Sequence, residues 1–210
     1  ALGIFGAGNV GSAVTNFGAP FLLVAFGWEK TAQIYALVLA LMGVFFIAFA
    51  KTDPLAQARA KAEQKSFAEQ MAPLKELRVW RFALYYFFVF GAFVALALWL
   101  PHYLIGVYGL NIQTAGMIAA MYTVPASLFR ILGGWLSDRY GARRVMYWTF
   151  TASVICTFLL SYPPTEYVIH GIEGDIRFSF EITLVVFVVL TFVLGFFMSL
   201  GTAAVFKHIP

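Results

Sequence analysis

Six long apolar stretches dominate this sequence. A helix needs roughly 20 residues to cross a bilayer, and each stretch is about that long. None shows the alternation of apolar and polar residues that is typical of a barrel strand. Only 11% of the residues are charged, against roughly 25% in a soluble domain, so lipid must cover much of the apolar surface. The sequence therefore predicts an all-α membrane protein with six transmembrane helices, in the ranges 1–26, 31–50, 79–100, 112–136, 145–162 and 181–206.

The basic residues gather in alternate connections between these stretches. Ten lie in residues 51–78, in residues 137–144 or near the chain end, and two lie in the other connections: Lys51, Arg59, Lys61, Lys65, Lys75, Arg78, Arg139, Arg143, Arg144 and Lys207 against Lys30 and Arg177. Loops rich in Lys and Arg stay on the cytoplasmic side of a membrane. We therefore expect a multi-pass protein whose loops 51–78 and 137–144 are cytoplasmic.

Residues 51–78 differ from the rest of the chain because they are rich in Ala, Gln, Lys and Glu. We interpret them as a cytoplasmic linker between a first membrane unit, 1–50, and a second, 79–210. The chain opens on Ala inside an apolar Gly-rich stretch and stops abruptly after another apolar run. We therefore expect an interior fragment whose partner is the missing remainder of the same chain.

Signals for enzyme chemistry are weak. The three histidines are scattered and the single Cys156 lies in an apolar run, so no spacing indicates a metal site. No nucleophile–base pair stands out. We expect no enzyme, no metal, no cofactor and no nucleic-acid partner.

The Gly-rich run at residues 6–11, Gly-Ala-Gly-Asn-Val-Gly, matches the dinucleotide pattern G-x-G-x-x-G. That pattern needs a preceding strand and a soluble βαβ unit, whereas small residues here recur every four positions, as in closely packed membrane helices. Asn9, Ser12 and Asn16 share one face. They bond to neighbouring helices, or they line a cavity that donates N–H groups to a polar ligand.

Arg130 is the one clearly intramembrane charge, and no carboxylate within the predicted spans can pair with it. A central Arg costs roughly 2.5–3.5 kcal/mol on insertion scales. It either binds an anionic substrate or snorkels to the cytoplasmic surface. Thr123, Ala126 and Ser127 share its face, and Pro125 should bend the helix there.

Two further features surround this residue. Tyr86 and Phe90 are four residues apart, so their rings could flank a flat anion or stack on a guanidinium. The segment from Gly133 to Arg144 joins a Gly pair to a charged tight turn. The glycines allow close helix approach, and Asp138 can bond an Arg or a helix N-terminus, which would make a charge lock and hence a gate.

This turn resembles the signature of the major facilitator superfamily, G-x-x-x-D-R-x-G-R-[RK]. The matching positions are Gly134, Asp138, Arg139 and Gly141, and Ala142 delays the basic pair by one residue, to Arg143 and Arg144. The resemblance implies that the six predicted helices correspond to helices five to ten of that family, a partial fold of the superfamily. It implies a gating role for Gly134, Asp138, Arg139 and Arg143.

Within the superfamily the chain resembles the nitrate/nitrite porters. The Gly-Asn step at 8–9, the buried Arg130 and the run Tyr86, Phe90, Gly91, Ala92, Phe93 carry this resemblance. It implies a planar nitrate or nitrite anion held by Arg130 and a second Arg outside this chain. Tyr86 and Phe90 would sandwich the anion and Asn9 would line the cavity.

We therefore expect a secondary transporter for nitrate or nitrite in the bacterial inner (plasma) membrane, working by alternating access. No predicted span has an Asp or Glu in its interior, since Glu181 lies at the outer edge of the last span. Proton-coupled carriers commonly use such carboxylates, so anion exchange is favoured over proton symport. A facilitator for another small or organic anion, a membrane-embedded enzyme or nucleotide-binding protein, and an anion channel stay open as alternatives.

Overall fold

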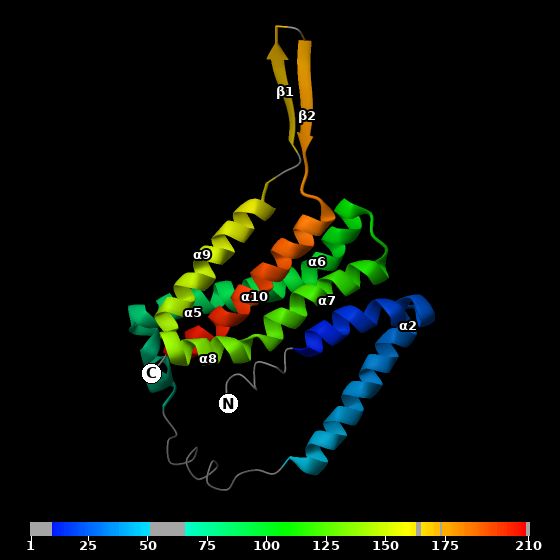
Figure 1. Ribbon diagram of the computed structural model, residues 1–210. Coiled ribbons are helices and arrows are strands. Elements are labelled where there is room, and N and C mark those ends of the chain that lie inside the picture. The colour runs from blue at the N-terminus through cyan, green and yellow to red at the C-terminus, as the bar shows by residue number, and fades with distance from the viewer. Residues whose placement is uncertain (1–9, 51–65, 163–164, 173, 209–210) are drawn as a thin grey trace. The chain divides into compact units, whose positions relative to one another are not determined.

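The computed structural model describes residues 10–50, 66–162, 165–172 and 174–208. This part of the chain is mostly helical and divides into two compact units. One unit consists of residues 1–18 and 85–210, and the other of residues 19–84. Figure 1 labels the elements along the chain.

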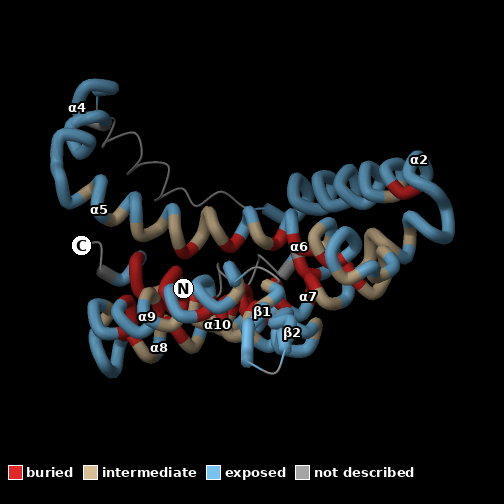
Figure 2. Tube along the Cα trace, turned by 90° about the horizontal axis from the view of Figure 1, so that it is seen from above, coloured by how far each residue is buried: buried red, intermediate tan, exposed pale blue. Residues whose placement is uncertain are grey.

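Helix α2 (Val10–Phe49) contains the described parts of the first two predicted spans. Its backbone leaves helical geometry at Gly27, with φ 76° and ψ 171°, a conformation that glycine adopts readily because it lacks a Cβ. The expected break between the two spans is therefore one residue wide. Nearly every described side chain from residue 21 to 49 is exposed (Figure 2), which suits a surface that lipid covers.

The described end of the predicted linker forms two short helices, α4 (Phe67–Met71) and the 3₁₀ turn η1 (Ala72–Lys75). Ser66 and Glu69 form a capping box in which the Ser66 backbone N–H donates to Glu69 Oε2 at 3.0 Å. Residues 51–65 lie outside the described residues.

The third predicted span is a run of three helical segments: α5 (Leu77–Tyr86), the π-helical η2 (Phe87–Ala92) and α6 (Phe93–Tyr108). It continues beyond residue 100 through Pro101 and ends at Gly109, whose left-handed φ of 64° closes the helix. Single π-turns of this kind change the angular position of the side chains that follow them.

The fourth predicted span is divided into α7 (Ile112–Leu128) and α8 (Arg130–Tyr140). Asn111 caps α7 by accepting the Thr114 N–H at 2.7 Å. The chain stays α-helical through Pro125 and leaves the helix at Phe129, with φ −72° and ψ 1°. The predicted bend thus exists, but four residues later than Pro125.

The last elements are α9 (Ala142–Leu160) and α10 (Leu184–His208), joined through a β-hairpin. Strands β1 (Thr165–Gly171) and β2 (Gly174–Phe180) pair antiparallel, with Tyr167 stacked on Phe178 at 4.9 Å between ring centroids. The hairpin projects beyond the ends of α9 and α10 (Figure 1). The hairpin lies in the connection between the last two predicted spans, and the alternation of Ile176, Phe178 and Phe180 with polar residues is a sequence signal for a strand.

By length and apolar composition, four helices of the described chain could span a membrane: Ala13–Phe49, Leu77–Tyr108, Ile112–Tyr140 and Leu184–Lys207. The count is lower than six for two reasons. The first of the four holds two predicted spans on either side of Gly27. Helix α9 has 19 residues but begins with Arg143 and Arg144 near its N-terminus, which lowers its mean hydropathy.

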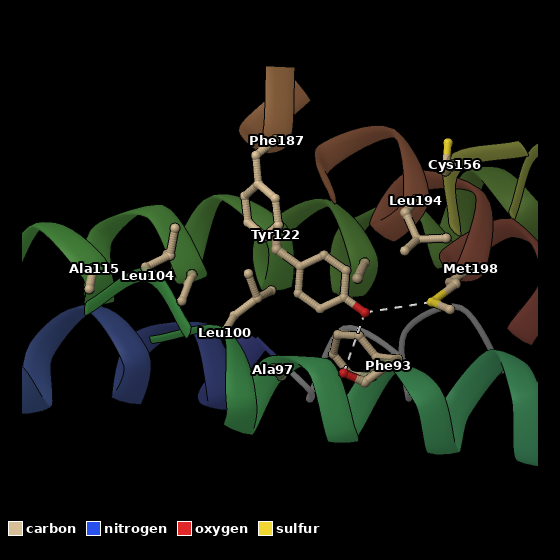
Figure 3. Packing of buried hydrophobic residues seen from close by; sticks show 12 residues of the cluster. Phe93, Ala97, Leu100, Leu104, Ala115, Tyr122, Cys156, Phe187, Leu194 and Met198 are labelled. Carbon is tan, nitrogen blue, oxygen red and sulfur yellow. Dashed lines mark hydrogen bonds between the residues drawn. The ribbon is translucent and has the colours of Figure 1, made fainter. Parts of the chain in front are cut away.

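The core of the larger unit lies where α6, α7, α9 and α10 meet. Tyr122 on α7 is its central side chain, with 1% of its surface exposed. Its hydroxyl donates to the Phe93 carbonyl at 3.4 Å or to Met198 Sδ at 3.5 Å (Figure 3). Tyr122 therefore links α7 to both α6 and α10.

Helix α10 packs closely against its neighbours because glycine stands at three contacts. A Cβ at Gly133 of α8 would lie 2.7 Å from Leu200 Cα, one at Gly195 would lie 2.9 Å from the Tyr122 ring, and one at Gly201 would lie 2.5 Å from Thr149 Cγ2. Small residues allow such approach of helix backbones. A Cβ at Gly134, by contrast, would have nothing within 4 Å, so only the first glycine of the predicted pair serves this packing.

Replacing Gly133 with Ala should destabilise the protein by about 1–3 kcal/mol, because the new methyl group overpacks the backbone of α10. Gly134→Ala is the matched control. It should leave stability unchanged or slightly raised, since alanine is the better helix former. Thermal unfolding of the full-length protein in detergent measures both, and equal unfolding midpoints for the two variants would contradict the packing assignment.

Candidate functional site

The side chain of Arg130 is buried at the start of α8, directly after the break at Phe129. Only 5% of its surface is exposed. Its Nε donates to the Ala126 carbonyl at 3.3 Å, and its guanidinium carbon lies 5.5 Å from the centroid of the Phe90 ring and 5.6 Å from that of Phe93. Both distances are in the range of cation–π contacts. Arg130 therefore does not snorkel to the surface.

No carboxylate in the described part of the chain neutralises Arg130. The two ion pairs found there are Lys207 with Asp138 and His170 with Asp175. Nor does any described residue accept a hydrogen bond from the two terminal NH₂ groups. A buried cation without a counter-charge is costly. Its free edge is the fork that binds planar oxyanions through two hydrogen bonds.

The rings of Tyr86 and Phe90 stack directly on each other. Their ring centroids are 5.1 Å apart and their planes differ by 15°, so no planar ion fits between them. The expected sandwich is therefore wrong for this conformation. The other expectation for this pair, stacking on a guanidinium, is met by Phe90. Phe93, which the sequence indicated only as part of a family motif, is the second ring beside Arg130.

The polar face of α7 that leads to Arg130 is buried and internally satisfied. Thr123 and Ser127 are both 0% exposed, and Ala126 beside them is also buried. The Thr123 hydroxyl donates to Ala119 or Ala120, and the Ser127 hydroxyl donates to Thr123, each to a carbonyl of its own helix. Their oxygens keep lone pairs, but their protons are already used.

Of the predicted polar stripe on the first span, the side chain of Asn16 is described. Its Nδ2 donates to the Ala97 carbonyl of α6 at 3.3 Å. This contact fits the interpretation as bonding between helices. Asn9 lies outside the described residues, as does the Gly-rich run up to residue 9, and the side chain of Ser12 is not described.

The predicted gate at 137–144 is a tight corner between α8 and α9. Helix α8 ends at Tyr140 and α9 begins at Ala142, so Gly141 alone lies between them, at φ 89°. Asp138 pairs with Lys207 near the end of α10 rather than with an Arg or a helix N-terminus. The sequence marks Lys207 only by its charge, because nothing in it shows that α8 and α10 end side by side.

The two predicted gating arginines contact aromatic side chains. The Arg139 guanidinium carbon lies 5.5 Å from the Trp135 ring and 5.7 Å from that of Tyr140. Arg143 donates to the Tyr147 hydroxyl at 3.1 Å from Nη2. Both are exposed, and neither is in an ion pair with a described carboxylate.

Curated relatives are similar in sequence to this chain over most or all of its length. A protein described as "Probable nitrate/nitrite antiporter NarK1" from Thermus thermophilus is 41% identical, over 100% of this chain and 49% of the relative. The "Nitrite extrusion protein" of Bacillus subtilis is 34% identical, over 78% of this chain and 40% of the relative. The "Probable nitrate transporter NarT" of Staphylococcus carnosus is 31% identical, over 99% and 48%.

The chain thus spans about half the length of the curated relatives it matches. No solved structure matches it. The family model described as Major Facilitator Superfamily matches residues 1–210. Together with the apolar helices, this match makes the chain part of an integral membrane protein with a superfamily fold, and the chain belongs to the Major Facilitator Superfamily.

Proposed function

We propose that this chain is part of a secondary transporter that moves nitrate or nitrite across the membrane by alternating access. The observation that carries the proposal is the buried Arg130, which no described carboxylate neutralises and whose terminal NH₂ groups have no described acceptor. The names of the relatives, which specify nitrate or nitrite, support this anion class over others.

The binding geometry follows from the contacts of Arg130. Phe90 and Phe93 flank the guanidinium and exclude water from it, which strengthens its attraction for an anion. Tyr86 stacks on Phe90 and supports this wall. Nitrate is flat and carries a single charge, so a guanidinium fork matches it in shape and charge. Asn9 and a second Arg outside this chain would complete the site.

The domain arrangement is part of the same proposal. Residues 1–50 are the last two helices of the first half of the carrier, 51–78 are the linker and 79–210 are the first four helices of the second half. The protein would lie in the inner (plasma) membrane of a bacterium, with loops 51–78 and 137–144 in the cytoplasm, as the distribution of Lys and Arg favours.

The corner between α8 and α9 would act as the cytoplasmic gate, with Gly134, Asp138, Arg139 and Arg143 as its residues. The ion pair of Asp138 with Lys207 joins the ends of α8 and α10. Both partners are exposed, so the pair is worth only about 0.2–1 kcal/mol. A contact of that strength can break and reform in every transport cycle.

A carrier for another small anion is the second candidate, because a guanidinium fork between aromatic rings also suits a carboxylate. Competition of nitrate uptake by short carboxylates separates the two substrate classes.

Replacing Arg130 with Lys should abolish most transport while the protein still inserts. The variant keeps the charge but loses the fork that makes two hydrogen bonds. Nitrate uptake into proteoliposomes, normalised to the amount of protein, measures the effect, and Arg177→Lys on the exposed strand β2 is the matched control. Uptake at the wild-type rate in Arg130→Lys would remove this residue from the site.

Breaking the pair of Asp138 with Lys207 should slow transport by no more than about fivefold, in keeping with an exposed ion pair. Asp138→Asn and Lys207→Gln should have similar effects. The double variant that exchanges the two charges, Asp138→Lys with Lys207→Asp, should recover most of the rate. If the exchanged pair transports no better than the single variants, the gate does not depend on this contact.

Nitrate uptake into proteoliposomes should require nitrite inside and should be insensitive to a pH gradient, because no predicted span embeds a carboxylate. Initial rates with and without internal nitrite, at equal and unequal pH, measure both dependences. Flux that follows the pH gradient without internal nitrite would show proton symport instead.

A further inference from the structure

Ser199 on α10 has a hydroxyl that is buried and bonded to nothing in the described structure. The residue is 1% exposed, and Ser199 and Ser153 hold the two described buried side-chain polar atoms without a hydrogen-bond partner. A hydroxyl buried without a partner costs about 1–3 kcal/mol, so its presence needs an explanation.

The neighbouring hydroxyls avoid this cost by bonding to their own helix. On α10 itself, Thr202 donates to Met198 at 2.8 Å and Thr191 donates to Phe187 at 2.9 Å. On α8, Ser137 donates to Gly133 at 2.7 Å. A helical Ser has this carbonyl within reach, yet the hydroxyl of Ser199 does not use it. Its proton remains available to a ligand.

The position of Ser199 around α10 follows from its neighbours, since successive residues are about 100° apart on a helix. Gly195, which abuts Tyr122, and Phe206, whose ring contacts Tyr86 at 5.0 Å, are each within about 40° of Ser199 on this basis. Gly201, which abuts Thr149 of α9 and Val89 of η2, is about 160° away. Ser199 therefore faces away from Thr149 and toward the side of α10 that contacts Tyr122 and Tyr86.

That side of α10 contacts two residues that pack on the rings beside Arg130. Tyr122 contacts Phe93 at 5.7 Å between centroids, and Tyr86 stacks on Phe90. Phe93 and Phe90 are the two rings that flank the guanidinium. Ser199 lies along α10 between Gly195, which abuts Tyr122, and Phe206, whose ring contacts Tyr86.

Contacts on the other side of Ser199 agree with this placement. Phe196, three residues before it, packs edge-on against Phe129 at 4.9 Å, and Phe129 is the residue directly before Arg130. Leu200, which follows Ser199, abuts Gly133, three residues after Arg130. The level of Ser199 along α10 is thus the level of the break between α7 and α8.

We propose that the Ser199 hydroxyl donates a hydrogen bond to the oxyanion held by Arg130, which makes α10 part of the substrate site. The inference rests on the proposed function, because Arg130 must hold the substrate. It explains why the Ser199 hydroxyl keeps its proton free while those of Thr123 and Ser127 do not. Arg130 supplies the charge, and Ser199 supplies a directed neutral donor from another helix.

The test measures the KM for nitrate of the full-length transporter in proteoliposomes, for the wild type and three variants. Ser199→Ala should raise the KM at least about tenfold, the low end of the loss expected for one hydrogen bond to a charged group. Ser199→Thr retains the hydroxyl and should stay within about threefold of the wild type. Ser153→Ala is the matched control, because it removes the other unpartnered buried hydroxyl, on α9, and should leave the KM unchanged.

A purely structural role predicts a different result, since removing an unpartnered buried hydroxyl is neutral or stabilising and leaves the KM alone. A wild-type KM in Ser199→Ala, an equal rise in Ser153→Ala, or a loss in Ser199→Thr as large as in Ser199→Ala would each overturn the inference. The proposed function fails separately: it falls if the wild type shows no saturable nitrate transport or if Arg130→Lys transports normally.

Discussion

A guanidinium cation without a counter-charge from the described chain sits at the break between α7 and α8, and the arrangement around it depends on how that charge is tolerated. Placing an Arg at the centre of a membrane helix costs roughly 2.5–3.5 kcal/mol on insertion scales. The faces of Phe90 and Phe93 recover part of that cost, and Ala126 accepts one hydrogen bond. The remaining donors have no acceptor in the described chain.

Close packing holds this arrangement in place. Because lipid offers no hydrophobic drive for helices to associate, contact between membrane helices depends on shape and on small residues. Gly133, Gly195 and Gly201 let α10 approach α8, α7 and α9, and Tyr122 links α7 to α6 and α10. The aromatic rings beside Arg130 are held by the same contacts, since Phe93 also packs on Tyr122.

Some features of the candidate site can be predicted from the sequence and others cannot. Arg130 could be predicted because a charge inside an apolar run is conspicuous, and Phe90 because its spacing from Tyr86 matches a family pattern. The stacking of Tyr86 directly on Phe90 could not be predicted, because ring-to-ring distance depends on the π-helical turn η2 and not on spacing. Ser199 gave no signal, because a serine in an apolar helix is ordinary until its missing partner is seen.

Apolar length and the placement of Lys and Arg by themselves determined that this chain forms membrane helices, with the break at Gly27 and the corner at Gly141 where expected. These properties depend on local composition, because the apolar content of a segment decides whether it forms a membrane helix and the Lys and Arg content of a loop decides on which side of the membrane it stays. Only the tertiary structure decided that Arg130 is buried and that Asp138 pairs with Lys207. It also decided that the buried hydroxyl of Ser199 on α10 has no hydrogen-bond partner in the described chain. Each of these depends on which helices become neighbours, a long-range outcome that no local window of residues contains.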